Sequence, residues 1–165
     1  EQVVGELKAF RTDLAFIEGP VADSGIRVLP WQDDELLVFS HPDHRLAQEE
    51  VVGIQDLENE PWVLREKGSG TREVFERAVS GKLDNLWVKM ELGNSEAVKK
   101  AVINGIGLGC LSRRALAYEL ESGRIKPLCV RGLDLGRKLI FLQHRSKYTT
   151  RLMQAFMDAT LQMQP

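Results

Sequence analysis

The sequence has little of three things that would each point to a class of protein. It holds two cysteines in 165 residues, Cys110 and Cys129, and they lack the spacing of a metal site. We therefore expect two buried thiols in a reducing compartment, although a disulfide between them stays open. No apolar run approaches the length of a membrane span, and no signal peptide is evident. The net charge of −2 does not favour a surface that grips nucleic acid.

The residues that are present describe an alternation of strands and helices. Apolar residues make up 43% of the chain, enough to bury a core. Short apolar runs, bounded by glycine, proline or polar residues, alternate with segments of helical periodicity. This order predicts the α/β class with a mainly parallel sheet. The expected strands are 14–17, 35–40, 62–64, 86–92, 108–112 and 138–143, with 29–31 as an edge strand; the expected helices are 1–10, 113–122 and those that begin near residues 70, 95 and 150.

The stretch 62–79 reads as a strand, a glycine loop and a helix. Ser69 or Thr71 is suited to cap that helix, and Gly70 lies between them. A glycine loop that opens a helix leaves backbone N–H groups pointing outward, and the helix dipole adds partial positive charge there. The positive charge of Arg72 in the first turn is unfavourable beside the helix dipole alone, and a bound anion would offset it. The stretch is therefore either a small-anion site or a capped turn that binds nothing.

A second junction of the same kind follows the strand 86–92. Gly93 ends that strand, and Asn94 or Ser95 is a good cap for the next helix. Glu96 suits the first turn of a helix. Two such junctions in tandem favour the anion-site hypothesis more strongly than one junction alone.

Other motifs are weaker. Glu18 follows the first expected strand at its carboxyl end, so it is either a site residue or a loop carboxylate in water. His41 and His44 have a metal-like spacing, but Pro42 predicts an extended turn between them, and no third ligand is evident. The glycines of 105–109 precede a strand rather than a helix, which is the wrong order for a dinucleotide fingerprint. We therefore predict no metal, no cofactor and no catalytic group.

Five segments, in this order along the chain, resemble one bacterial family. Each segment alone is common, but the joint pattern spans most of the chain. The sequence is similar to the carboxyl-terminal effector-binding domain of LysR-type transcriptional regulators. The segments GSGTRE and ELGNSEA most resemble the YeiE-like subgroup, which resembles regulators tied to sulfur oxyanions. The matching segments are DLAFIEGP (13–20), ELLVFSHPDHRLA (35–47), QDLENEPWVLREKGSGTREVFE (55–76), MELGNSEAVKKAVINGIGLGCLSRRAL (90–116) and ELESGRIKPL (119–128).

The resemblance implies a two-lobed, periplasmic-binding-protein-like (type 2) fold with an incomplete lobe one. Effector would bind in the cleft between the lobes. Lobe one would hold residues 1–40 and 136–165, lobe two 44–126, and the crossover segments 41–43 and 127–132. Taken with the two junctions and the strand end described above, the resemblance gives one set of expected effector-binding residues: Glu18, Ser40, Ser69, Gly70, Thr71, Arg72, Gly93, Asn94 and Ser95.

The implied function is that of an effector-sensing domain in a cytoplasmic regulator. Binding of a small oxyanion such as sulfate or sulfite would change the geometry of the cleft or of the dimer. A DNA-binding partner domain would respond to that change. The winged helix-turn-helix that contacts DNA, and the first strand–helix–strand of lobe one, are absent, so the chain is interpreted as N-terminally truncated. A homodimer or tetramer without membrane contact would be the working form. Two alternatives stay open: a free solute-binding protein of the same fold, and a bilobal enzyme whose titratable groups would be Glu18, Arg65, Glu66 and Arg72.

Overall fold

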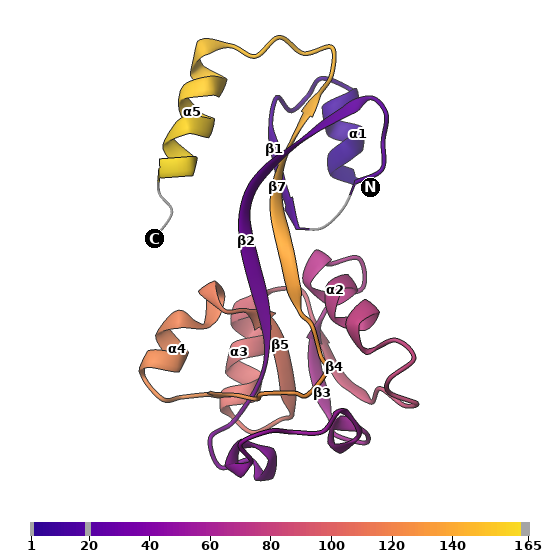
Figure 1. Cartoon of the computed structure of the whole chain (residues 1–165), viewed down its shortest axis with the longest axis vertical. Helices are drawn as coiled ribbons and strands as arrows, with labels where there is room; N and C mark the ends of the chain where they lie inside the picture. Colours follow the sequence, from indigo (N-terminus) through magenta and orange to yellow (C-terminus); the bar gives the residue numbers. More distant parts are fainter. Residues whose placement is uncertain (1, 19–20, 163–165) are drawn as a thin grey trace. The chain divides into compact units, whose positions relative to one another are not determined.

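The computed structural model of the chain (Figure 1) describes residues 2–18 and 21–162. Contacts between residues divide the chain into two compact units. The first unit combines both ends of the chain, and the second is one continuous segment. The first unit is residues 1–33 with 137–165, and the second unit is residues 34–136.

The boundary between the units falls inside strand β2 (Ile26–Ser40), between Asp33 and Asp34. The sequence placed it at residue 40 instead. The difference arises because residues 36–39 of β2 pair with a strand of the second unit, and because 29–31 and 35–40 form one strand rather than two. The crossover roles of 41–43 and 127–132 stay predictions.

The first unit contains two helices and the strand order β1-β7-β2. Strand β1 (Ala15–Glu18) is antiparallel to β7 (Gly136–His144), with Ala15 opposite Leu142. Helix α1 (Gln2–Lys8) contributes Leu7 to a small core. The Oγ1 of Thr150 accepts the Met153 N–H at 3.2 Å and so caps helix α5 (Arg151–Gln162), as expected. The buried residues of this core are Leu7, Ala15, Ile26, Ile140 and Leu142.

The second unit contains the strand order β2-β5-β3-β4, with β6 paired to the end of β2. Strand β3 is parallel to both β4 and β5, whereas β2 is antiparallel to β5 and β6. The sheet is therefore mixed rather than mainly parallel, because only β3, β4 and β5 are joined by helical crossovers. Its elements are η1 (Arg45–Gln48), η2 (Ile54–Leu57), β3 (Trp62–Arg65), α2 (Gly70–Val79), β4 (Val88–Leu92), α3 (Ser95–Ile103), β5 (Leu108–Ser112), η3 (Arg114–Leu116), α4 (Ala117–Glu121) and β6 (Lys126–Pro127).

Alternate residues of the strands in the second unit enter two separate cores. Because successive side chains of a strand point to opposite faces, Trp62 and Leu64 join one core and Val63 joins the other. Helix α2 supplies Phe75 to the first core, and α3 supplies Val98 to the second. The two helices thus cover opposite faces of the sheet, and each begins just after a strand ends.

The cysteines only partly follow the sequence expectation. Cys110 lies in β5 and is buried, as predicted. Cys129 is exposed, because it lies in the segment that follows the short strand β6 rather than in the core. Neither cysteine forms a disulfide bond among the described residues.

Candidate functional site

The junction between β3 and α2 has the predicted strand–loop–helix form. Ser69 occupies the N-cap position with extended backbone angles, and Gly70 is the first helical residue. The Ser69 side chain does not cap the helix, and it is nine-tenths buried. Within the described part of the chain, no hydrogen bond of its hydroxyl group is observed. A hydroxyl group beside uncapped N–H groups can donate to a bound hydrogen-bond acceptor.

The junction between β4 and α3 is capped as predicted. Asn94 Oδ1 accepts the Ala97 N–H at 2.8 Å, and Ser95 is the first residue of the helix. A Cβ atom added at Gly93 would meet no atom within 4 Å, so the approach to this helix end is open. Of the two cap candidates that the sequence offered, Asn94 is therefore the one that caps the helix.

This cap gives a direct test of the local structure. We expect Asn94→Ala to lower the free energy of unfolding by about 1 kcal/mol, because the Ala97 N–H loses its acceptor. Urea denaturation followed by circular dichroism measures the change. Asn85→Ala, at an exposed loop position, is the control and should change the free energy little. An equal effect of the two substitutions would contradict the capping role.

The two helix N-termini lie at the same edge of the sheet. Strands β3 and β4 are parallel neighbours, with Arg65 opposite Leu92, so their carboxyl ends coincide. Arg65 also joins the junctions directly, because its Nη1 donates to the Ser95 Oγ at 3.3 Å. The N-termini of α2 and α3 thus lie at one edge of the sheet in the second unit, and the ligand-binding roles of residues 69–72 and 93–95 stay predictions.

Arg65 and Glu66 form a bidentate ion pair at this edge. Arg65 Nε lies 2.7 Å from Glu66 Oε2, and Nη2 lies 2.8 Å from Oε1. The hydrogen bonds from the guanidinium, with its positive charge, hold the pKa of the Glu66 carboxyl below its ordinary value. The sequence raised these two residues only as a titratable pair for an enzyme and did not place them among the ligand-binding residues.

Arg72 does not have the predicted arrangement. Its side chain is 4% exposed, and its Nε donates to Glu76 Oε1 at 2.6 Å. Its Nη1 donates to the backbone oxygen of Arg65 at 3.1 Å, and Glu91 lies 4.0 Å away. The guanidinium therefore already balances a carboxylate and supports the end of β3. Thr71, the other predicted residue of this turn, is also buried.

Ser40 lies at the opposite edge of this sheet, so its expected place beside the two helix N-termini is corrected. Because β2 is antiparallel to β5, Phe39 pairs with Gly109 near the amino end of β5. Strand β5 is parallel to β3, which puts Ser40 at the amino ends of these strands. The Ser40 hydroxyl is buried and donates to the His41 carbonyl at 3.0 Å.

Glu18 belongs to the first unit, where its carboxylate pairs with Arg137. Arg137 Nη1 lies 2.6 Å from Glu18 Oε2, and the Arg137 side chain is only 4% exposed. Glu18 thus neutralises a buried cation, which favours a structural role for it. Gly19 and Pro20, which follow it in the matched segment, lie outside the described residues.

The carboxyl end of β5 adds a polar cluster that the sequence analysis did not single out. Ser112 Oγ donates to Asp34 Oδ1 at 2.7 Å and accepts the Arg114 N–H at 3.2 Å. Arg114 Nε lies 4.0 Å from the same Asp34 oxygen. Because β5 is parallel to β3, this cluster lies at the same sheet edge as the two helix N-termini. A serine followed by two arginines directly after an apolar strand was the signal that could have revealed it.

A match along the whole given sequence identifies the family of the chain. Residues 1–165 match the family described as the LysR substrate binding domain. The chain belongs to this family. That membership, with the relatives below, confirms the resemblance that the matched segments indicated, and the family comprises regulatory domains rather than enzymes.

The curated relatives of this LysR domain carry the names of HTH-type transcriptional regulators. It is 40% identical to the HTH-type transcriptional regulator YeiE of Escherichia coli K12 over 158 residues, which are 96% of this chain and 54% of that protein. It is 34% identical to CysL of Bacillus subtilis over 86% of this chain and 48% of that protein. The chain therefore spans about half the length of the curated relatives that it matches.

Solved structures confirm the two-lobed, periplasmic-binding-protein-like fold of the LysR domain. The regulatory domain of Synechocystis CcmR, in complex with 2-PG, matches with a TM-score of 0.87 at 27% identity, over 98% of this chain and 78% of that one. The effector-binding domain of QuiR, in complex with shikimate, matches with a TM-score of 0.83 at 20% identity, over 98% and 76% of the two chains.

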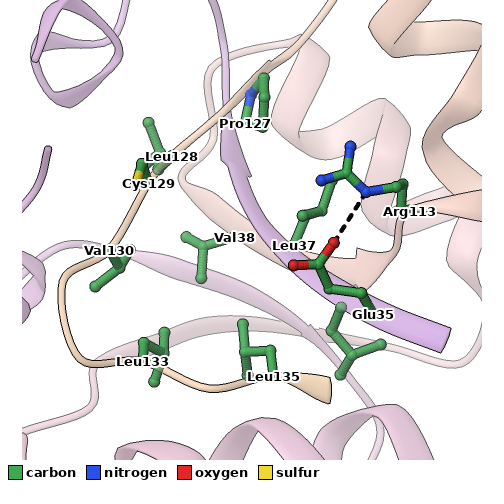
Figure 2. Close-up of a pocket in the computed structure, with 11 residues that line it drawn as sticks. Glu35, Leu37, Val38, Arg113, Pro127, Leu128, Cys129, Val130, Leu133 and Leu135 are labelled. Carbon is green, nitrogen blue, oxygen red and sulfur yellow. Dashed lines mark hydrogen bonds and ion pairs between the residues drawn. The ribbon is translucent and has the colours of Figure 1, made fainter. Parts of the chain in front are cut away.

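A separate groove of about 320 Å³ lies along β2 in the second unit (Figure 2). Aliphatic side chains line most of it, and the Glu35–Arg113 ion pair, at 3.0 Å, lies at one end. Cys129 lines it as well, opposite these two residues in the view shown. The groove lacks the helix N-termini of the other edge, so it is a weaker candidate for the anion site of the LysR domain.

Over residues 2–18 and 21–162, no group of three His, Cys, Asp or Glu side chains has a geometry that could hold a metal ion. In the same part of the chain, no helix combines the length and apolar character that crossing a membrane requires.

Proposed function

We propose that the chain is the effector-sensing domain of a DNA-binding transcriptional regulator, and that it binds a small oxyanion between the N-termini of α2 and α3. The observation that carries this proposal is the convergence of these two helix ends at one sheet edge, where the Ser69 hydroxyl makes no hydrogen bond observed among the described residues. The complexes of CcmR with 2-PG and of QuiR with shikimate support a small-molecule ligand for this fold.

The ligand class follows from the groups at the edge. Ser69 and Ser95 offer hydroxyls, the two helix ends offer N–H groups, and Arg65 offers a guanidinium. These are predominantly hydrogen-bond donors, so they suit sulfate or sulfite better than an apolar effector. A ligand of about five heavy atoms gains at most about 1.5 kcal/mol per atom, which limits the Kd to a few micromolar at best.

In the intact regulator, ligand binding would alter DNA affinity through parts of the protein beyond this chain. A coupling free energy of about 1–3 kcal/mol is enough for such a switch. We propose that the regulator is a cytoplasmic homodimer or tetramer and that DNA contact comes from a winged helix-turn-helix. The proposal is of a binding domain without catalysis. Binding of the ligand in a cleft between the two lobes, which the resemblance implied, stays a prediction.

Thermal unfolding tests the ligand site. With sulfate or sulfite at one hundred times its Kd, we expect about 2.7 kcal/mol of stabilisation, seen as a melting temperature raised by several degrees. Chloride at the same ionic strength should give a much smaller rise, because it carries a single charge and has no separate oxygens to accept the individual hydrogen bonds. Ser69→Ala and Ser95→Ala should each reduce the selective rise, since each removes a hydroxyl donor.

The control for these variants is Ser80→Ala. Ser80 is the exposed C-cap of the same helix α2, and its side chain lies at the end away from the proposed site. It should keep the full rise in melting temperature. Equal shifts with sulfate, sulfite, phosphate and chloride would refute the oxyanion site, as would full selective shifts in both Ser69→Ala and Ser95→Ala.

A further inference from the structure

The Arg65 guanidinium lies where it could bind an anion, but it is paired with the carboxylate of Glu66. The Arg65 side chain is 21% exposed and emerges at the carboxyl end of β3. Its Nη1 donates to Ser95 at the start of α3, which orients the guanidinium toward the shared helix edge. The Nε and Nη2 atoms, which present the bidentate face of the group, both bind Glu66.

We propose that Glu66 is an internal competitor that the ligand must displace from Arg65. This inference rests on the proposed function and adds a selectivity device to it. Two parallel N–H groups recognise two oxygens of one ligand, so sulfate, sulfite or phosphate can take the place of the carboxylate. Chloride is a single acceptor atom, so it cannot form the two parallel N–H···O bonds that two oxygens of one ligand form. The Glu66 pair thereby selects polyatomic oxyanions.

The exposures of the two side chains determine which partner leaves. Glu66 is 39% exposed, so its carboxylate can become hydrated when the pair opens. Arg65 is more buried and keeps its contact with Ser95. The neighbouring pair of Arg72 and Glu76 differs, because Arg72 is 4% exposed and also donates to the Arg65 backbone. Of these two guanidinium groups, Arg65 is the one that can exchange its carboxylate for a ligand.

Calorimetric titration with inorganic sulfate tests the competition. Glu66→Gln removes the charge but keeps an acceptor atom of similar size, so we expect the variant to bind sulfate about tenfold more tightly than the unaltered protein. Glu73→Gln is the matched control. Glu73 is an exposed residue in the first turn of α2, so its substitution removes the same charge near the site without opening the Arg65 pair. Its affinity for sulfate should change less than about twofold.

The outcomes separate this inference from the proposed function. Equal affinities of the unaltered protein and Glu66→Gln would overturn the competition and leave the oxyanion site intact. An equal gain in Glu73→Gln would also overturn it, because general electrostatics would then explain the effect. Binding seen only in Glu66→Gln would support the competition. If none of the three proteins bound sulfate, sulfite or phosphate, both proposals would fail.

A second measurement guards against a folding defect in the variant. The Arg65 Nε–Hε resonance reports the guanidinium environment directly. Sulfate added to the unaltered protein should shift this resonance, because the Glu66 contact is replaced. A resonance that stays in place while sulfate binds elsewhere would contradict the displacement. Circular dichroism of Glu66→Gln confirms that the partly exposed substitution leaves the fold unchanged.

Discussion

Gly107→Ala is expected to lower the free energy of unfolding by about 3 kcal/mol. A Cβ atom at this position would lie 2.2 Å from the Pro61 carbonyl oxygen and 2.8 Å from its carbon, and backbone atoms cannot move aside as a side chain does. The same oxygen accepts the Leu108 N–H at 2.8 Å, so the contact fixes the start of β5 beside the residue before β3. Separating the two segments to fit a methyl group would break that hydrogen bond.

Urea denaturation measures the effect of Gly107→Ala. Gly93→Ala is the matched control, because a Cβ at Gly93 meets no atom within 4 Å. It should change the free energy of unfolding by less than about 0.5 kcal/mol. Equal losses from both substitutions would show that glycine at position 107 serves only chain flexibility and not close packing.

Lys99→Met is expected to cost about 3 kcal/mol of stability, because it leaves the buried Glu119 carboxylate without its cation. Lys99 Nζ lies 3.0 Å from Glu119 Oε1 and 2.7 Å from Glu96 Oε1, and it donates to the Ala115 carbonyl at 3.1 Å. Burial alone would lower the pKa of Lys99, but hydrogen bonds to the two carboxylates raise it above its ordinary value. The side chains of Lys99 and Glu119 are 8% and 9% exposed.

The double variant Lys99→Met/Glu119→Met separates charge from packing. It removes both buried charges and keeps two long side chains between α3 and α4, so it should regain most of the lost stability. Lys100→Met, at the exposed neighbouring position, is the control and should change stability little. A double variant that is less stable than Lys99→Met would contradict the account, because removal of the second charge would then bring no recovery.

Local chemistry explains what could be predicted from the sequence. The cap at Asn94 and the start of β5 at Leu108 depend on neighbouring residues, and both agree with the structure. The two strand–helix junctions were recognised for the same reason. The position of Ser40 could not be found this way, because it depends on the antiparallel register of β2 and β5, which pairs residues far apart in sequence.

The contacts that long side chains make could not be predicted from the sequence either. Arg72 in a first turn suggested an anion ligand, but its guanidinium reaches Glu76 and the backbone of Arg65. Arg65 was overlooked because a residue at a strand end gives no periodic signal. Pairing between Glu18 and Arg137 joins the two ends of the chain, so no local pattern could reveal it.

The first unit combines two separate segments of the chain and the second is one segment, so the two units differ in how they can fold during synthesis on the ribosome. Residues 34–136 are one uninterrupted segment, so every strand of the second unit has been made once Gly136 has emerged. Strand β1, in contrast, is made early but pairs with β7, with Ala15 opposite Leu142. The amino-terminal segment must therefore wait, without its partner strand, while the whole second unit is translated. Phe16 of this strand, whose ring packs on Phe141 of β7 in the folded domain, lacks that contact during the interval.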